Sequence, residues 1–244
     1  GGEVRAVQVQ GNTAYVGIGP RLVILNTSNP ANPQFIGQSE PLSERVMGLA
    51  VSGNYAFAAI GYSGIAIINI SNAAAPQLVA VFDTPNVAID IAVAGNYAYV
   101  ADGYQGGMQV FNVSNPANPV ATGSFPSPTG SAEAVAVSGG YVYLADGMDG
   151  LRIINISNPA NPTQVGLFDS PNYALDVAVN GSGYAYLADI SAFIVVNVSN
   201  PAIPTQSGTL ASLGSSTAVF IFGSTAYVAE YNAGIRVVNI TTPG

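Results

Sequence analysis

Short apolar runs alternate with turn-forming residues along the whole chain, and residues 89–125 show the pattern clearly. Runs at 89–93, 97–101, 108–113 and 120–125 are rich in Val, Ile and Tyr, and each is short for a helix. Gly-Asn, Asp-Gly and Pro-containing segments separate the runs, and such residues form tight reversals of the chain. The pattern therefore predicts four short antiparallel β-strands and no helix here.

This four-run unit occurs six times. An aromatic residue of the second run recurs at intervals of 41 to 44 residues, at Tyr15, Phe57, Tyr99, Tyr143, Tyr186 and Tyr227. An Asn that ends the third run recurs at intervals of 42 or 43 residues, at Asn26, Asn69, Asn112, Asn155, Asn197 and Asn239. Because two separate sets of residues share one period, the chain consists of structural repeats.

Repeats of about 42 residues with four antiparallel strands are typical of β-propeller blades, which bury their faces against one another. The sequence therefore predicts an all-β fold, a single six-bladed β-propeller. The expected blades are about 3–43, 44–86, 87–130, 131–172, 173–215 and 216–244. The sixth repeat has no fourth apolar run, so its blade is expected to lack the outer strand.

The third runs carry a specific motif. They read Leu-Val-Ile-Leu-Asn at 22–26, and related segments end in Asn at 65–69, 108–112, 151–155, 193–197 and 235–239. With the preceding hairpin and the following Ser-Asn-Pro, these segments resemble the LVIVD repeat of bacterial and archaeal surface propellers. The final Asp of the family motif is Asn in all six units. The resemblance implies a secreted or surface-anchored propeller, and it brings no established catalytic residues.

Composition excludes much chemistry. The chain has no Lys, His, Cys or Trp, so a Ser-His-Asp triad, a thiol nucleophile, a Schiff base and a histidine metal site are all ruled out. Its net charge of −8 and scattered arginines argue against nucleic acid as a partner. No apolar run reaches the length of a membrane span. Since the chain starts without a signal-peptide pattern, an export signal is expected to have been removed already.

Five aspartates are candidate ligand or cation residues. Asp90 and Asp176 share one repeat position at the start of a first strand, and we expect them near the mouth of a central channel. Asp102, Asp146 and Asp189 lie in hairpins at the same, acidic end of the propeller. The structural alternative is that these carboxylates bind backbone donors at the rim and in the turns. No cofactor is expected, Ca2+ is a possible ligand, and no metal site is assigned because the EF-hand spacing is absent.

The six Asn residues that end the third runs also begin Asn-x-Ser/Thr sequons. Asn26, Asn69, Asn112, Asn155, Asn197 and Asn239 are therefore candidate N-glycosylation sites. The favoured interpretation is structural, because Asn and Ser side chains bind the backbone of the turn that reverses the chain.

The missing strand of blade six predicts an open edge. Ile235, Val237, Val238 and Ile240 are its candidate assembly residues, since unpaired strands template pairing with another chain. Two explanations stay open: the chain is part of a longer protein, or another subunit supplies the pairing by β-augmentation.

Three functions follow from these observations. The favoured one is a non-enzymatic, extracellular or cell-surface propeller with a structural or adhesive role, with protein subunits or surface polymers as partners and self-assembly through blade six. The second is a module that binds a glycan, a small polar ligand or a cation at the acidic mouth, with Tyr62, Tyr104 and Tyr231 as aromatic platforms. The third is a hydrolase or lyase that uses Asp90 and Asp176 as its paired carboxylates.

Overall fold

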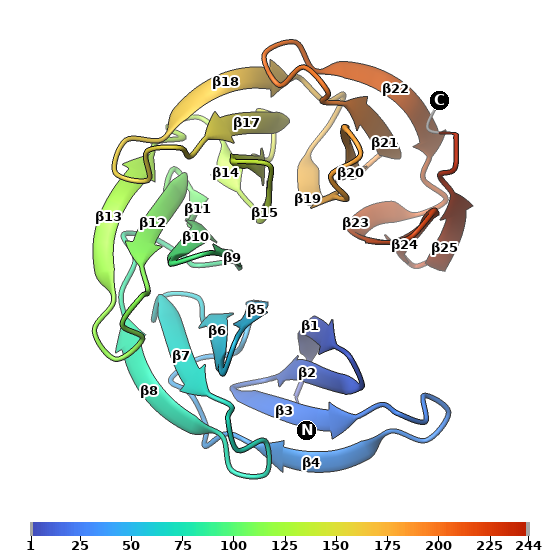
Figure 1. Cartoon of the computed structure of the whole chain (residues 1–244). Helices are drawn as coiled ribbons and strands as arrows, with labels where there is room; N and C mark the ends of the chain where they lie inside the picture. The colour runs from blue at the N-terminus through green and yellow to red at the C-terminus, as the bar shows by residue number, and fades with distance from the viewer. Residues whose placement is uncertain (1, 243–244) are drawn as a thin grey trace. The chain divides into compact units, whose positions relative to one another are not determined.

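The computed structural model describes residues 2–242, and no helix occurs within that range. Six antiparallel sheets form a six-bladed β-propeller, as the repeats predicted (Figure 1). The described residues contain no helical segment with the length and hydropathy needed to cross a lipid bilayer. The blades form two compact units. One comprises the residues up to Gly103 together with Gln109–Thr122, and the other comprises Tyr104–Met108 and the residues from Gly123 onward.

The blades follow one another along the chain. Blades one to three contain, in turn, β1 (Val4–Gln10), β2 (Thr13–Ile18), β3 (Arg21–Asn26) and β4 (Gln34–Gln38); β5 (Gly48–Ser52), β6 (Tyr55–Ala59), β7 (Ile65–Asn69) and β8 (Gln77–Phe82); and β9 (Asp90–Ala94), β10 (Tyr97–Ala101), β12 (Met108–Asn112) and β13 (Val120–Phe125). Blades four to six contain β15 (Ala134–Ser138), β16 (Tyr141–Ala145), β17 (Leu151–Asn155) and β18 (Thr163–Phe168); β19 (Ala174–Val179), β20 (Tyr184–Asp189), β21 (Ala192–Asn197) and β22 (Thr205–Ala211); and β23 (Ser215–Phe222), β24 (Thr225–Tyr231) and β25 (Gly234–Asn239).

The strands of blade three lie within one residue of the predicted runs. The hairpin between β9 and β10 is a two-residue turn, because Ala94 pairs with Tyr97. Gly95 opens this turn with a φ of 57°, a left-handed conformation that glycine adopts without steric cost. The runs did not predict the short sheet formed by β11 (Gly103–Tyr104) and β14 (Ser131–Ala132).

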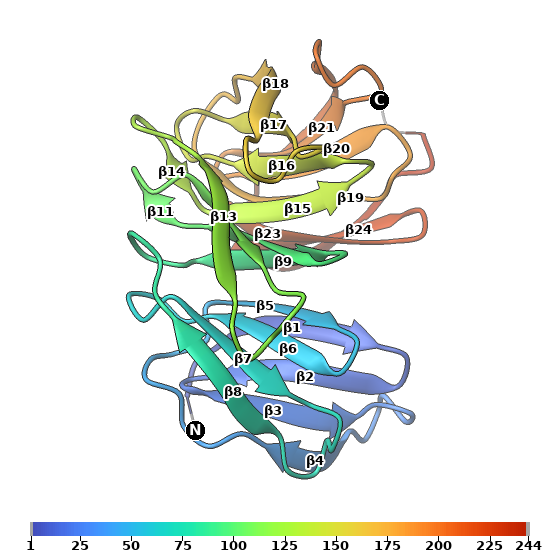
Figure 2. The same ribbon diagram turned by 60° about the vertical axis from the view of Figure 1, so that its left-hand side comes forward.

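Successive blades of a unit pack face to face, and the core lies between them. Figure 2 shows the sheet of blade one beside that of blade two. Between blades two and three, Phe57 and Ile67 on one sheet pack in a buried cluster with Ile91 and Val100 on the next. Because side chains alternate along a strand, one face of the blade-two sheet packs on blade one and its other face packs on blade three.

The third and fourth strands carry a second repeated feature. Their pairing shifts register once in each of four blades, at Ile24/Leu25, Ile67/Ile68, Ile153/Ile154 and Val195/Val196. Just beyond this bulge, a Cβ atom placed on Gly37 of β4 would lie 2.4 Å from the carbonyl oxygen of Ala73 in blade two. The glycine is required because the next blade's connection approaches the outer strand this closely.

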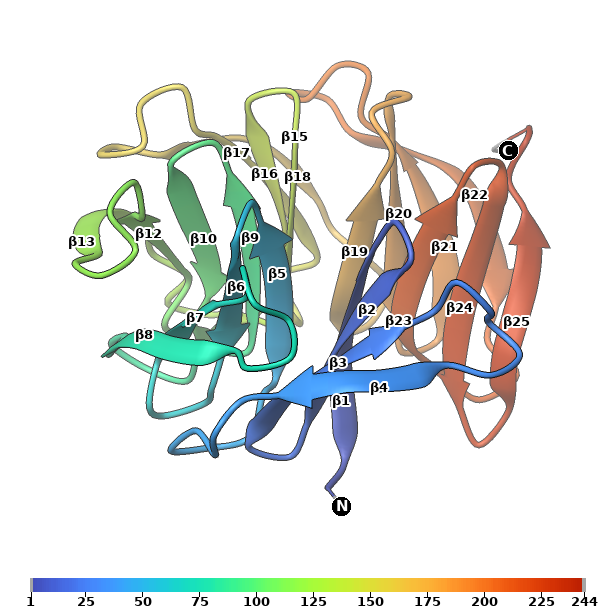
Figure 3. The same ribbon diagram turned by 60° about the horizontal axis from the view of Figure 1, so that its bottom comes forward.

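Blade six has three strands in the order β23-β24-β25, and within the described residues β25 pairs with β24 alone. The prediction of a last blade without a fourth strand is confirmed. Figure 3 shows β25 at the outer edge of this blade.

Candidate functional site

A buried carboxylate lies within one residue of the end of the second strand in four blades, at Asp102, Asp146, Asp189 and Glu230. In three of them it accepts a hydrogen bond from a backbone N–H of the connection that enters the blade. The pairs are Asn86 N to Asp102 Oδ2 (3.1 Å), Asn172 N to Asp189 Oδ2 (2.9 Å) and Leu213 N to Glu230 Oε1 (3.3 Å). These carboxylates hold the connection against the hairpin at one end of the blade, which is a structural role.

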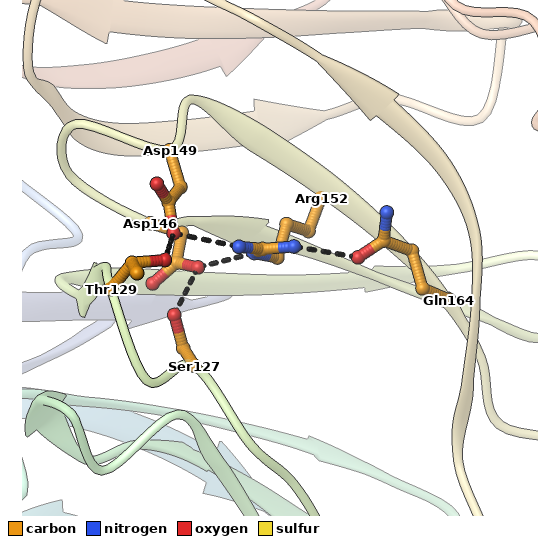
Figure 4. Close-up of polar contacts among 6 residues, drawn as sticks. All are labelled: Ser127, Thr129, Asp146, Asp149, Arg152 and Gln164. Carbon is orange, nitrogen blue, oxygen red and sulfur yellow. Dashed lines mark hydrogen bonds and ion pairs between the residues drawn. The ribbon is translucent and has the colours of Figure 1, made fainter.

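In blade four the equivalent carboxylate lies in a larger polar cluster, drawn in Figure 4. Asp146 accepts hydrogen bonds from the Ser127 hydroxyl and from the Arg152 guanidinium. The other contacts are Arg152 Nη2 to Asp149 Oδ2, Thr129 Oγ1 to Asp149 Oδ2 and Arg152 Nη1 to Gln164 Oε1, each 2.7 Å long. Two acids therefore share one arginine, and two hydroxyls of the connection complete the cluster. This is again a network that fixes the blade end.

Burial raises the pKa of Asp102 and of Asp146 above the ordinary carboxyl value. For Asp146, hydrogen bonds from Ser127 and Arg152 oppose the shift, but loss of hydration is the largest cause. Residues 2–242 contain no group of three or more Asp or Glu side chains that could hold a metal ion. The binding of Ca2+ or another ligand by these aspartates stays a prediction.

Asp90 and Asp176 have different surroundings although they share a repeat position. Asp176 uses both oxygens for backbone donors, with Oδ1 on Val177 N and Oδ2 on Val219 N, each at 2.8 Å. The second bond ties the first strand of blade five to that of blade six. Asp90 lies against blade two, where a Cβ on Gly48 would be 2.6 Å from its Oδ1 atom. The two aspartates belong to different compact units, and their joint site remains a prediction.

The sequon asparagines form turns. In every repeat the Asn Oδ1 atom accepts the backbone N–H two residues later, at 2.8 to 3.0 Å, from Ser28, Ser71, Ser114, Ser157, Ser199 and Thr241. A second Asn makes the same contact in five connections, at Asn29, Asn72, Asn115, Asn158 and Asn200. These contacts support the structural interpretation of the motif, and glycosylation stays a prediction.

Aromatic residues occur both on hairpins and in a pocket. The predicted platforms Tyr62, Tyr104 and Tyr231 are exposed. A pocket of about 180 Å³ between blades four and five, which sequence reasoning missed, is lined by Ser138, Gly139, Tyr141, Tyr143, Val179, Gly181, Gly183, Tyr184, Val198 and Pro201. The sequence feature that could have indicated this pocket is the glycine content of two hairpins, Gly139-Gly140 and Gly181-Ser182-Gly183. Small residues leave space between neighbouring turns.

The four candidate edge residues divide between the two sides of β25. Ile235 and Val237 are exposed, whereas Val238 and Ile240 pack in the cluster between blades five and six. Beside β25, a pocket of about 200 Å³ lies against blade five and is lined by Phe193, Val195, Gly208, Thr209, Leu210, Val238, Asn239, Ile240 and Thr242.

A larger apolar surface on blade six was also missed. Strand register places Phe220 opposite Tyr227, and Tyr227 opposite Val237, on one face of the sheet. Phe222 and Ile235 lie on the same face, and all five side chains are exposed. We call these five residues the blade-six face. Phe220 and Phe222 could have indicated this surface in the sequence. Blades two to five carry small residues at these positions, among them Ala178 and Asn180.

The repeated four-stranded sheets and their packing define a β-propeller. The LVIVD repeat matches five times, at residues 1–40, 45–84, 87–126, 129–170 and 171–211. The chain therefore belongs to the LVIVD repeat family, which confirms the resemblance seen in its third strands. The five matches end before blade six.

No curated protein matches this chain. Solved structures of low sequence identity share its fold. The periplasmic gluconolactonase PpgL of Pseudomonas aeruginosa is 14% identical, with a TM-score of 0.84 over 98% of this chain and 82% of that one. A functionally unknown protein from Desulfotomaculum acetoxidans is 12% identical, with a TM-score of 0.83 over 99% and 84%. The computationally designed Ika8 protein is 14% identical, with a TM-score of 0.76 over 99% and 72%.

Proposed function

We propose that this chain is a non-enzymatic propeller with a structural or adhesive role outside the cell, and that it attaches to other subunits through the edge strand β25. The observation that carries the proposal is the three-stranded sheet of blade six, in which β25 pairs on one side only among the described residues. An unpaired strand offers N–H and C=O groups to an extended segment of another chain.

The composition of β25 supports this role. Protective edge strands usually carry charged side chains that repel a second strand. Arg236 is the one charged residue of β25, and its guanidinium is held by the Ala211 carbonyl at 2.9 Å and the Glu230 carboxylate at 3.2 Å. The arginine is thus directed to neighbouring groups of the same unit. No other charge on the strand opposes pairing.

The extracellular location is an expectation that several features favour. The family resemblance implies surface propellers, and one structural neighbour is a periplasmic protein. Absence of lysine and a charged fraction of only 7% point the same way. Fractionation of the source organism into cytoplasm, cell wall and culture medium, followed by detection of the protein, tests this location. Protein found in the cytoplasm alone would contradict the proposal.

Analytical ultracentrifugation over a concentration series tests the assembly. We expect the average mass to rise with protein concentration as the molecules assemble. A peptide with the sequence of β22, Thr205–Ala211, should block this assembly, because β22 pairs with β21 at the equivalent edge of blade five. A peptide of the same composition in scrambled order is the control. A monomer at every concentration, with no binding of the β22 peptide, would refute the role of the edge.

Ligand binding is the second candidate, favoured by the exposed Tyr62, Tyr104 and Tyr231. Aromatic rings on a surface can stack on sugar rings. Calorimetry with Ca2+ and a glycan panel tests it, and the double variant Asp90→Ala, Asp176→Ala should lose any signal. Equal binding by the double variant would place the ligand elsewhere.

A carboxylate-based hydrolase is the least favoured candidate. Gluconolactonase activity is a property of PpgL, which is only 14% identical to this chain. Both oxygens of Asp176 already accept backbone hydrogen bonds, so this carboxylate is poorly placed to act as an acid or base as well. Glycan turnover that Asp176→Asn abolishes, with the fold intact, would reverse this order.

A further inference from the structure

The pocket between blades four and five lies at the hairpins that join the first strand of each blade to the second. It has a volume of about 180 Å³, and Tyr141, Tyr143 and Tyr184 line it together with glycines of both hairpins. Tyr143 is buried, whereas Tyr141 and Tyr184 are half-buried. We call this space the hairpin pocket. Its lining residues all belong to one compact unit, so its walls have a defined position relative to one another.

Two departures from the repeat distinguish these hairpins. Blade four turns at Gly139-Gly140, and blade five separates its strands by the four residues 180–183. Blades one to three instead turn at Gly-Asn, in Gly11-Asn12, Gly53-Asn54 and Gly95-Asn96. The tyrosines follow the repeat, since Tyr55 and Tyr97 occupy the position of Tyr141. The hairpins, and not the aromatic content, therefore distinguish this junction from those of the earlier blades.

Hydrogen bonds fix the longer hairpin of blade five. Asn180 Oδ1 accepts the backbone N–H of Ser182 at 3.1 Å and also binds the Ser182 hydroxyl. The carbonyl oxygen of Gly183 accepts the backbone N–H of Val198 at 2.8 Å. This wall of the pocket is therefore held in place before a ligand arrives. Such preorganisation favours binding, because the ligand does not have to order the wall.

The lining combines aromatic rings with hydroxyl groups and carries no charge within the described part of the chain. Ser138 and the three tyrosines supply hydroxyls, which both donate and accept hydrogen bonds. Val179 and Pro201 add apolar surface. A charged ligand would lose hydration here without gaining a counter-ion. The pocket therefore favours a neutral ligand that has both an apolar face and hydroxyl groups.

The volume narrows the choice further. Sites for drug-sized molecules measure about 300–1,000 Å³, so this pocket suits a single ring of a larger molecule. A sugar ring has an apolar C–H face that can stack on an aromatic ring, and its hydroxyls match those of the lining. Aromatic grooves also bind proline-rich peptides, but those grooves hold several residues of an extended segment. A prolyl ring would also leave the hydroxyls of the pocket without partners.

We propose that the hairpin pocket binds one neutral sugar unit of a glycan, with the C–H face of the sugar against the tyrosine rings and its hydroxyls bound by Ser138. The site differs from the exposed hairpin tyrosines such as Tyr231, which ends the second strand at the opposite end of its blade. The inference goes beyond the edge pairing of β25. No residue of the pocket lining belongs to β25 among the described residues, so the two ideas can fail separately.

Calorimetry and saturation-transfer NMR test the binding, with short oligosaccharides of glucose, galactose, mannose and N-acetylglucosamine as probes. Gly181→Asn is the blocking variant, because a Cβ atom there would lie 3.7 Å from Ser138 Oγ, across the pocket. Asn is among the residues that best tolerate the left-handed φ of 72° at this position. We expect binding to weaken about tenfold or more in this variant.

Gly11→Asn is the matched control. It makes the same change in the turn of blade one, at a φ of 57°, where an added Cβ atom has open space. Tyr184→Leu is a second variant, which removes a ring of the pocket and should weaken binding about two- to tenfold. It keeps the inference testable if Gly181→Asn does not fold. Circular dichroism confirms the fold of each variant.

Binding of a neutral oligosaccharide that Gly181→Asn or Tyr184→Leu weakens, and that Gly11→Asn retains, supports the inference. Binding that is equal in all three variants would place the sugar elsewhere and overturn it. The same conclusion follows if none of these oligosaccharides binds, or if only oligogalacturonate or a proline-rich peptide binds. If no neutral sugar binds while the β22 peptide still blocks assembly, the proposed function stands and this inference fails. Sugar binding by a protein that stays monomeric would have the reverse meaning.

Discussion

Blades five and six belong to one compact unit and share one repeat, but within that unit only blade five has a sheet packed on both of its faces. The same residue types at the same positions are buried in one blade and exposed in the other. Periodicity determines which face a side chain occupies, because side chains alternate along a strand. Whether that face is buried depends on the next sheet, and this is a property of the neighbour rather than of the residue.

The comparison has an energetic consequence. Full burial of a large apolar side chain contributes about 1.5–3 kcal/mol to stability relative to leaving it exposed. Blade five receives this contribution on both faces, whereas the blade-six face receives it from no sheet of its own unit. Blade six is therefore expected to be the least stable part of its unit, and a covering partner would stabilise it.

The largest expected effect comes from shortening side chains at the same repeat position in blades five and six. Phe193→Ala should lower the free energy of unfolding by about 3–5 kcal/mol, because it leaves a cavity in the cluster between blades five and six. Ile235→Ala at the same repeat position should cost less than about 1 kcal/mol in the monomer. Urea denaturation at low protein concentration measures both. Equal losses would mean that the blade-six face is covered.

A smaller effect is expected from the bond that anchors blade six. Asp176→Ala removes the acceptor of Val219 N and should cost about 1–3 kcal/mol, since a buried backbone donor loses its partner. Asp176→Asn keeps one carbonyl oxygen and should retain part of that stability. Hydrogen exchange of β23 amides reports the anchoring directly. Unchanged exchange in Asp176→Ala would show that side-chain packing alone holds blade six.

The smallest effect concerns pH and the buried aromatic of blade five. Burial raises the pKa of Tyr186 above 10.0, its unperturbed value. Ionisation is therefore easier in the unfolded chain. The stability that comes from burying the neutral Tyr186 ring is fully present below the pKa of this tyrosine in the unfolded chain. It is lost as pH rises through the pKa of Tyr186 in the folded protein. In Tyr186→Phe the free energy of unfolding should fall less at alkaline pH than in the unchanged protein, by about 1 kcal/mol or less. An identical pH dependence in the variant would contradict the assigned burial effect.

The sequence predicted the elements of this fold well, and it predicted contacts between them poorly. The ladder of aromatics at Tyr186 and its equivalents, with the glycine turns, located the blades because both signals are local. Asp102 was assigned to its hairpin, but its bond to Asn86 depends on which connection lies beside it. Asp90 and Asp176 share a repeat position and their joint site stays a prediction, but the sequence did not predict that Asp176 binds Val219 of blade six.

The missed surface has the same explanation. Phe220 and Phe222 fit a strand pattern equally well whether they are covered or exposed. Periodicity therefore could not predict their exposure. The sequence feature that distinguishes them is their difference from the small residues at these positions in blades two to five. The Tyr141 and Tyr184 pocket likewise arises from the spacing of two hairpins, which pattern reasoning does not supply.

The glycine of the outer strand has an evolutionary consequence. At Gly37, Gly123 and Gly166 the same closeness recurs, with the carbonyl of the following blade's connection 2.0 to 2.4 Å from the site of a Cβ atom. These three junctions are thus built alike, whereas blade two carries Ala80 at the equivalent position. Tandem duplication or loss of one repeat within a gene would join old junctions without creating an unfamiliar one, so repeat number can drift while each blade keeps its shape.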